Sequence, residues 1–281
     1  MKIIRTVREM QDFADAARGA GRRIALVPTM GYLHEGHLSL VREAARRGDE
    51  VVVSIFVNPT QFGPNEDLDA YPRNFEGDRA LSDSAGATVI FAPEPEEIYA
   101  PGFQTYVTLE ALPAHLCGLS RPVHFRGVAT VVTKLFNIVK PHVAVFGEKD
   151  YQQLLVVRRM VRDLNFDVEI VGGPIVREED GLAMSSRNAY LGADQRKQAL
   201  CLSRSLDLAE AAVKAGETDP ARLINAARER IAAEPDAEID YVRVVDPETL
   251  EDATTVQAPV VMALAVNIGR TRLIDNRMLV P

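Results

Sequence analysis

The stretch "RRIALVPTMGYLHEGHLSLVREAARRGD" (22–49) joins an apolar run to an amphipathic run through a polar segment that contains glycine. The first part, "RRIALVP" (22–28), predicts a buried strand, and "GHLSLVREAARRGD" (36–49) predicts a helix that Gly48 ends. A strand, a loop and a helix in this order are typical of an α/β sheet. The loop would then follow the carboxyl end of a strand, where such sheets bind their ligands.

The same alternation continues over the first two-thirds of the chain. Nearly continuous Val, Ile and Phe in "EVVVSIFVNP" (50–59) predict a parallel strand that is covered on both faces. Further elements follow in turn, with strands predicted over 88–93, 142–147 and 168–176 and helices over 74–87, 127–140 and 151–164. The pattern predicts a Rossmann-like, doubly wound parallel sheet over residues 1–176.

The character of the sequence changes after "REEDG" (177–181). Helical patterns over about 193–215 and 219–233 precede three strand-like runs, "IDYVRVV", "VVMALAVNIG" and "TRLIDNRMLV". Helices followed by successive strands predict a second, smaller α+β domain over residues 177–281.

Composition excludes several classes of protein. The 32 basic and 40 acidic residues give a net charge of −8 without a Lys/Arg-rich tract, so nucleic acid is not an expected partner. Apolar stretches are far shorter than the about 20 residues of a membrane helix, and the charged N-terminal segment is unlike a signal peptide. Cys117 and Cys201 provide neither a disulfide framework nor a four-cysteine zinc site. We expect a cytoplasmic protein that acts on small molecules.

Four polar clusters follow predicted strands. They are "TMGYLHEGH" (29–37), "NPTQF" (58–62), "GEKDYQQ" (147–153) and "DGLAMSSRN" (180–188). Because ligands of an open α/β sheet bind beyond the carboxyl ends of its strands, we expect these clusters to converge on one active site.

The first cluster holds two of the five histidines, His34 and His37. A metal site would need further ligands, and the spacing is not that of the HExxH zinc helix. A phosphate site has a mechanism, since His37 falls in the first helical turn, where free N–H groups favour an anion. Gly31 and Gly36 would let the backbone approach such a ligand closely. An ordinary polar turn is the third interpretation, and the spacing alone does not choose among the three.

The motifs together carry a resemblance. "HEGH" resembles the HIGH-type motif of the nucleotidylyl-transferase superfamily, and "MSSRN" (184–188) stands where that superfamily has its KMSKS-type loop. With "LVPTMGYLHEGHLSLV", "SIFVNPTQF", "RPVHFRGV", "FGEKDYQQL" and "DGLAMSSRN" in this order, the chain resembles the pantothenate synthetase (pantoate–β-alanine ligase) family. The similarity runs from about Lys2 to "RLIDNRM", almost the full chain.

The resemblance implies an ATP-dependent, Mg²⁺-using ligase that condenses D-pantoate with β-alanine. The pantoate carboxylate would attack the α-phosphorus, giving pantoyl adenylate and pyrophosphate, and the β-alanine amine would then displace AMP. Substrate and ATP supply both reacting groups, so the protein must supply alignment and charge stabilisation. The resemblance also implies a homodimer, and the smaller domain could close over ATP as a lid that excludes water.

Individual roles come from the same resemblance. His34, His37 and Lys149 are implied as the catalytic contacts to the phosphates, with His34 as the donor in the transition state. The implied ATP-binding residues are Pro28, Thr29, Met30, His34, His37, Gly147, Lys149, Asp150, Val176, Met184, Ser185, Ser186 and Arg187. The implied substrate-binding residues are Met30, Asn58, Gln61, Arg121, His124 and Gln153, of which Gln61 and Gln153 would hold the hydroxyl and carboxylate groups of pantoate.

Asp78 is the candidate metal residue, as a Mg²⁺ contact through water, and the alternative is an exposed helix acid. Two positions depart from the family pattern. Gly77 stands where relatives often have another acid, which weakens the metal assignment, and Cys117 stands where a glutamate is expected.

Three other functions compete with the ligase. A nucleotidyltransferase acting on a phosphate substrate would call for more basic residues than the two glutamine motifs provide. A nucleotide-binding regulator would bind ATP without releasing pyrophosphate. A zinc hydrolase would contain stoichiometric zinc.

Overall fold

The computed structural model describes residues 1–64 and 66–281, and packing divides it into two compact units. Unit 1 comprises Met1–Glu110, Arg121–Glu148 and Gln153–Pro174. Unit 2 comprises Ala111–Ser120, Lys149–Gln152 and Ile175–Pro281.

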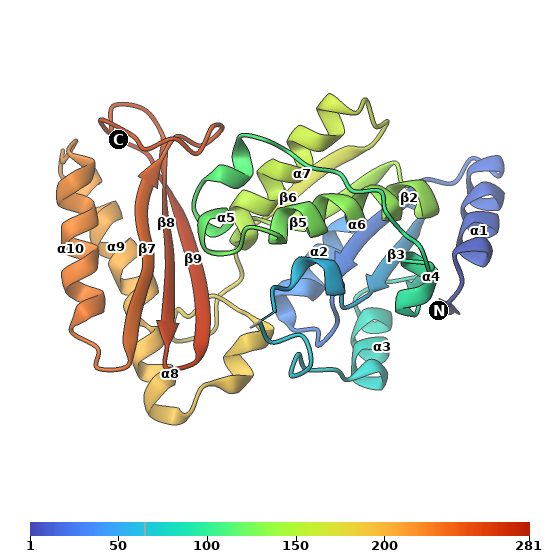
Figure 1. The fold of residues 1–281 in the computed structure, drawn as a ribbon, viewed down its shortest axis with the longest axis horizontal. Helices are drawn as coiled ribbons and strands as arrows, with labels where there is room; N and C mark the ends of the chain where they lie inside the picture. The colour runs from blue at the N-terminus through green and yellow to red at the C-terminus, as the bar shows by residue number, and fades with distance from the viewer. Residues whose placement is uncertain (65) are drawn as a thin grey trace. The chain divides into compact units, whose positions relative to one another are not determined.

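Unit 1 is built on a six-stranded parallel sheet (Figure 1). The order is β1-β4-β3-β2-β5-β6. The order changes direction between β2 and β5, which are neighbours, and ligands of such sheets bind beyond the carboxyl ends of the strands at this switch point. The predicted Rossmann-like sheet is thereby confirmed. Its strands are β1 (Lys2–Ile4), β2 (Ile24–Thr29), β3 (Glu50–Ile55), β4 (Val89–Phe91), β5 (Val143–Gly147) and β6 (Glu169–Gly173).

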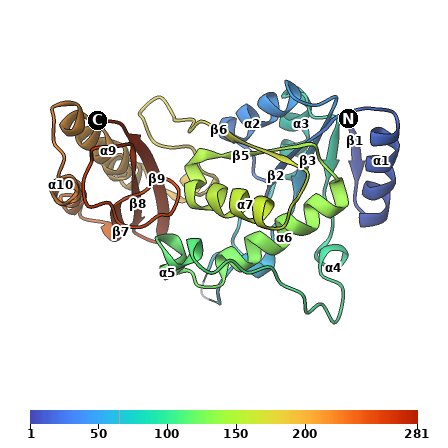
Figure 2. The ribbon, with the colours of Figure 1, turned by 90° about the horizontal axis from the view of Figure 1, so that it is seen from above.

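Helices cover both faces of this sheet (Figure 2). One face packs against α1 (Val7–Gly19), α6 (His124–Val139) and α7 (Tyr151–Asp163), and the other against α2 (Glu35–Ala45) and α3 (Phe75–Ser84). Shorter turns are η1 (Pro59–Gln61), α4 (Pro95–Ile98) and η3 (Glu148–Asp150).

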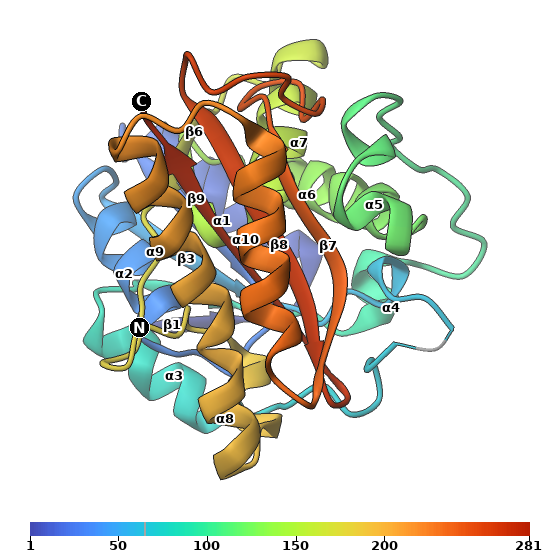
Figure 3. The ribbon, with the colours of Figure 1, turned by 90° about the vertical axis from the view of Figure 1, so that its left-hand side faces the viewer.

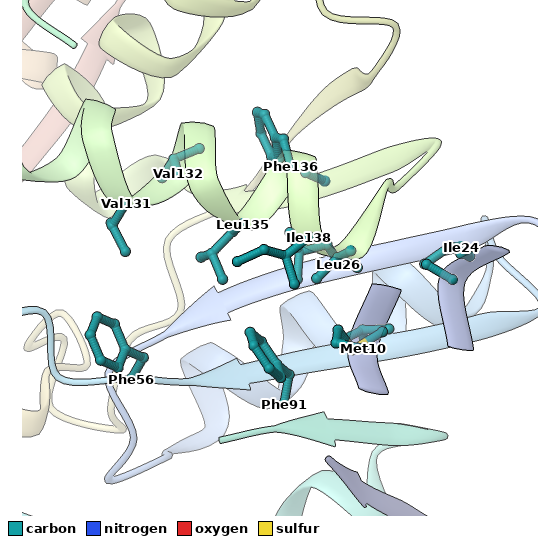
Figure 4. Close-up of a cluster of buried hydrophobic side chains, with 14 of the residues drawn as sticks. Met10, Ile24, Leu26, Phe56, Phe91, Val131, Val132, Leu135, Phe136 and Ile138 are labelled. Atoms are coloured by element: carbon teal, nitrogen blue, oxygen red, sulfur yellow. The ribbon is translucent and has the colours of Figure 1, made fainter. Parts of the chain in front are cut away.

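The first face carries the larger core of unit 1, and Figure 4 shows Leu135 and Ile138 of α6 directed toward Leu26 of β2. Each fully buried side chain of this size contributes roughly 1.5–3 kcal/mol. This explains why the strands read as unbroken apolar runs: both of their faces are buried.

Several predicted elements end earlier than expected: the helix predicted over 74–87 ends at Ser84 and the strand predicted over 168–176 at Gly173, and the ends of α2 and β3 differ as well. Helix α2 ends at Ala45, before Gly48. The C-cap is Arg46, and the Gly48 N–H donates to the Ala44 carbonyl oxygen at 3.0 Å. A Cβ at Gly48 would lie 2.8 Å from the Ala25 Cβ, so this glycine also serves a close approach to β2. The strand predicted over 50–59 ends at Ile55.

Unit 2 is built on an antiparallel sheet, β7-β8-β9, with strands Ala237–Val245, Val260–Ile268 and Thr271–Leu279. Figure 3 shows α9 (Cys201–Lys214) and α10 (Pro220–Ala232) across one face of it. The helix predicted over 193–215 is in fact two, since α8 (Ala193–Ala199) and α9 meet at Leu200. Shorter elements are η2 (Leu112–Ala114), α5 (Cys117–Ser120) and η4 (Ser186–Tyr190).

The three-stranded sheet and its helices confirm the smaller α+β fold that the sequence predicts. Across the described part of the chain, the helices all lack the combination of length and apolar composition that crossing a bilayer would need.

Candidate active site

The loop after β2 carries both histidines to the start of α2. His34 is the N-cap residue and His37 lies in the first turn, with the two ring centroids 4.1 Å apart. The His34 backbone N–H donates to His37 Nδ1 at 3.3 Å. Because a backbone N–H can only donate, a neutral His37 carries its hydrogen on Nε2. His37 can therefore act as a donor to an anion at the helix N-terminus.

Asp78 of α3 holds this loop in shape. Its two carboxylate oxygens accept hydrogen bonds from the backbone N–H groups of Tyr32, at 2.8 Å, and Leu33, at 2.7 Å. Tyr32 has a φ of 51°, a left-handed conformation that a tyrosine adopts only where its surroundings impose it. A Cβ at Gly31, with φ 84°, would lie 2.9 Å from Asp78 Oδ2.

The alternative of an exposed helix acid is therefore wrong, because Asp78 is only 3% exposed. Burial raises the pKa of its carboxyl, and the two backbone hydrogen bonds counteract the rise. Within residues 1–64 and 66–281, no group of three or more His, Cys, Asp or Glu side chains could hold a metal ion.

The "NPTQF" segment forms a buried amide pair. Asn58 is 1% and Gln61 7% exposed, and Asn58 Nδ2 donates to Gln61 Oε1 at 3.0 Å. Gln61 Nε2 donates to the sulfur of Met30 at 3.3 Å. The Gln61 carbonyl oxygen lies 3.1 Å from His124 Nδ1 and accepts from Arg121 Nη2 at 3.4 Å. Four of the six predicted substrate residues, Met30, Asn58, Arg121 and His124, thus contact a fifth, Gln61. Gln61 is a buried residue and does not belong to the surface.

Arg121 is also paired with an acid. Its Nε donates to Glu66 at 2.9 Å, and its Nη2 bonds to the same carboxylate. Burial alone would raise the pKa of Glu66, but the hydrogen bonds and charge of Arg121 outweigh it and hold the pKa below its usual range. Arg121 therefore helps to hold the residues around Gln61 in place. Its contact with a substrate stays a prediction.

A glycine of α6 lets the helix touch this cluster backbone to backbone. A Cβ at Gly127 would lie 2.4 Å from the Thr60 carbonyl oxygen and 2.6 Å from the Gln61 Cα. Neither backbone can yield as a flexible side chain would, so the approach of α6 to η1 requires glycine here.

We expect Gly127→Ala to displace the turn that carries Gln61. Overpacking of this kind costs about 1–3 kcal/mol of unfolding free energy. Denaturant titration would measure this loss. Gly19→Ala is the control, because a Cβ there meets nothing within 4 Å. Equal stability of the two variants would contradict the close-approach argument.

The residues that follow β5 belong partly to unit 1 and partly to unit 2. Gly147 ends β5 in unit 1, and Lys149 and Asp150 follow in η3 within unit 2. Buried Gln152 donates to the carbonyl oxygens of Leu112 and His115 and accepts from the Cys117 N–H at 3.0 Å. Of the two adjacent glutamines, Gln152 is thus structural, and half-buried Gln153 belongs to unit 1.

In unit 2, the "MSSRN" segment extends from a short hairpin. Arg177 bridges Ala183 across it, and the Met184 N–H donates to the Val176 carbonyl oxygen at 3.0 Å. The Ser185 hydroxyl then caps η4 by accepting from the Arg187 N–H at 3.3 Å.

Strand β9 anchors this hairpin and the Lys149 segment, both within unit 2. The Arg177 guanidinium donates to both oxygens of Asp275, at 2.7 and 2.9 Å, and also to the Gly181 carbonyl oxygen at 3.0 Å. The next residue, Asn276, donates from Nδ2 to the Lys149 carbonyl oxygen at 2.9 Å. The sequence motifs do not indicate Asp275 and Asn276, although "RLIDNRM" lies inside the resemblance.

The predicted site residues therefore form two groups, one in each unit. Those in unit 1 are Pro28, Thr29, Met30, His34, His37, Asn58, Gln61, Asp78, Arg121, His124, Gly147 and Gln153. Those in unit 2 are Lys149, Asp150, Val176, Met184, Ser185, Ser186 and Arg187. The binding role of each stays a prediction.

A doubly wound sheet with a histidine-bearing helix N-terminus at its switch point defines a ligand-binding α/β protein with a site suited to anions. The family model described as pantoate-beta-alanine ligase matches residues 2–278. The chain belongs to this family, which confirms the resemblance seen in its sequence.

Individual relatives agree over their whole lengths. The pantothenate synthetase of Desulfatibacillum aliphaticivorans is 61% identical over 281 residues, covering 100% of both chains. The pantothenate synthetase of Geobacter sulfurreducens is 58% identical over 279 residues, covering 99% of each.

Solved structures agree as well. A crystal structure of pantothenate synthetase from Thermus thermophilus has a TM-score of 0.95 and 48% identity, covering 100% of both chains. That of the pantoate–β-alanine ligase of Francisella tularensis, complexed with beta-gamma ATP and beta-alanine, has a TM-score of 0.83 and 32% identity. It covers 99% of this chain and 97% of the other.

Proposed function

We propose that this protein condenses D-pantoate with β-alanine at the expense of ATP, giving pantothenate, AMP and pyrophosphate. The family membership and the full-length relatives support the reaction, and the ATP- and β-alanine-bound structure of the Francisella relative supports those two substrates. Within unit 1, one contact supports the proposed reaction. The 3.3 Å contact from Gln61 Nε2 to the Met30 sulfur links the buried amide cluster to the loop that bears His34.

The reaction proceeds in two steps. A carboxylate oxygen of pantoate attacks the α-phosphorus, the bond to the β-phosphate oxygen breaks, and pyrophosphate leaves. The amine of β-alanine then attacks the acyl carbon of pantoyl adenylate, loses a proton and displaces AMP. His34 and His37 donate to phosphate oxygens as charge moves onto them, and Lys149, Ser185, Ser186 and Arg187 hold the departing phosphates.

Mg²⁺ is part of this proposal as an ion that arrives with ATP. A single protein carboxylate fits such an ion, because Mg²⁺ keeps several waters and binds mainly through substrate phosphates. Each Asp78 oxygen accepts one backbone hydrogen bond and keeps a second lone pair. A contact with Mg²⁺ through water is therefore compatible with the hydrogen bonds by which Asp78 holds the loop. Bound Mg²⁺ would neutralise phosphate charge.

Pyrophosphate release with ATP, Mg²⁺ and D-pantoate, before and after β-alanine is added, tests the proposal. We expect a pantoate-dependent burst near one equivalent that becomes steady turnover with β-alanine. ATP binding without any pyrophosphate would favour a regulator, and turnover with a phosphate substrate instead of pantoate would favour a nucleotidyltransferase. The homodimer, the lid role of residues 177–281 and a cytoplasmic location belong to the same proposal, and light scattering would test the first.

Gln153→Ala should raise the KM for pantoate by about three- to tenfold, as expected for the loss of one neutral hydrogen bond. The KM for ATP should stay within about twofold. Gln104→Ala, which changes an exposed glutamine of unit 1, is the matched control. Equal weakening for both ligands would show that Gln153 lies outside the pantoate pocket.

A further inference from the structure

Two backbone groups fix the orientation of the Asn58 side-chain amide. The Thr60 N–H donates to Asn58 Oδ1 at 3.4 Å, and Asn58 Nδ2 donates to the Gly127 carbonyl oxygen at 3.2 Å. A backbone N–H can only donate and a carbonyl oxygen can only accept. Turning the amide over would therefore put two donors face to face and two acceptors face to face.

Two hydroxyl groups strengthen the same orientation. The Tyr99 hydroxyl donates to Asn58 Oδ1 at 2.8 Å, and the Thr60 hydroxyl donates to it at 2.9 Å. Burial raises the pKa of Tyr99 to about 12, so its hydroxyl remains protonated at ordinary pH. Oδ1 is thus fully used as an acceptor, and Nδ2 is the atom that Asn58 turns toward Gln61.

The fixed orientation of the Asn58 amide in turn fixes that of the Gln61 amide. Gln61 Oε1 accepts from Asn58 Nδ2 at 3.0 Å, which leaves Nε2 as the other end of the Gln61 amide. One N–H of Nε2 is directed at the Met30 sulfur, a weak acceptor. The Nε2 end of the Gln61 amide, which carries the donors, is therefore the end that lies away from Asn58.

We propose that Tyr99 is a positioning residue that, together with the backbone groups of Thr60 and Gly127, holds Asn58 so that Gln61 donates, and that this site therefore selects an acid with a hydrogen-bond-accepting oxygen at Gln61. Such an oxygen is a carboxylate oxygen or a hydroxyl lone pair of the substrate. The inference rests on the proposed function, because it takes Gln61 as a pantoate contact. It adds a direction to that contact and a residue that family resemblance did not supply.

The direction of the contact can be tested with two substitutions at Gln61. Gln61→Ala removes the group, whereas Gln61→Glu keeps an acceptor for Asn58 and puts a carboxylate oxygen in place of the N–H donors. We expect the KM for pantoate to rise at least about tenfold more in Gln61→Glu than in Gln61→Ala at neutral pH, since two acceptors then face each other. Lowering the pH should narrow this gap as the new carboxyl protonates and becomes a donor. A Gln61→Glu variant that matches or outperforms Gln61→Ala at every pH would overturn the inference.

The role of Tyr99 can be tested by removing only its hydroxyl. Tyr99→Phe should raise the KM for pantoate by about three- to tenfold, with kcat and the KM for ATP within about twofold. Tyr106→Phe is the matched control, because exposed Tyr106 stacks on Phe103 and Arg126 through its ring. An unchanged KM for pantoate, or equal changes for pantoate and ATP, would refute the positioning role. Failure of the proposed function would be seen separately, as wild-type protein that releases no pyrophosphate with pantoate.

Discussion

Replacing His34 with alanine should slow pantoate-dependent pyrophosphate release by about a hundredfold, the usual effect of losing one preorganised donor to a transition state. The hydrogen bonding around His34 explains why we expect the reaction rate to fall while the local fold is kept. His34 contributes its backbone N–H to His37, and this bond survives truncation of the side chain. The start of α2 and the hydrogen-bonding state of His37 should therefore persist.

His115→Ala is the control for this experiment, since His115 lies in unit 2 and its backbone oxygen is the group that Gln152 binds. Single-turnover release of pyrophosphate should be measured for both variants alongside their thermal stability. An unchanged rate for His34→Ala would remove His34 from the mechanism. A parallel loss of rate and stability would instead mean that the side chain is needed to build the loop.

Removing the Asp275 carboxylate should lower the free energy of unfolding by about 1–3 kcal/mol, the cost of leaving the largely buried Arg177 guanidinium without this hydrogen-bond partner. Arg177 binds both oxygens of that carboxylate, and Asp275 is only 3% exposed. Denaturant titration of Asp275→Ala would measure the loss.

The matched control is Asp207→Ala, which removes one of the two acidic partners of Arg277 on the same strand; Glu210 is the other. The Asp207 side chain is 64% exposed, so we expect a change within about 1 kcal/mol. The double variant Arg177→Met, Asp275→Leu should recover much of the loss, because a buried ion pair can be replaced by apolar groups of similar size. A single variant no worse than the control would show that the pair does not hold the hairpin.

Apolar patterning predicted the large sheet because β2, β3 and β5 are buried on both faces and read as nearly continuous apolar runs. It predicted no element in the first 20 residues, although these hold the helix α1 as well as β1, which has three residues and lies at the sheet edge. The end of α2 was misplaced for a different reason. Gly48 resembles a helix stop, but it is needed for contact with Ala25, and local sequence does not contain that contact.

The candidate site shows the same limit. Motifs and resemblance could indicate His34, Lys149 and Gln61, because these lie in short polar segments that follow strands. They could not indicate Tyr99, whose bond to Asn58 spans 41 positions. Nor could they show that Asp78 is buried, because its partners lie in a loop more than 40 residues earlier.

In unit 2, the anchoring of the Arg177 hairpin and of the Lys149 segment depends on the alignment of one hairpin, β8-β9. β8 and β9 are joined by the two residues Gly269 and Arg270 and pair over their full lengths, with Asp275 opposite Leu264 and Asn276 opposite Ala263. Neighbouring strand residues point to opposite faces, so a slip of one position would reverse both side chains. The Arg177 guanidinium would lose the Asp275 carboxylate, and the Lys149 carbonyl oxygen would lose the Asn276 amide, at the same time. A hairpin that slips by one position could therefore not keep one of the two anchors without the other.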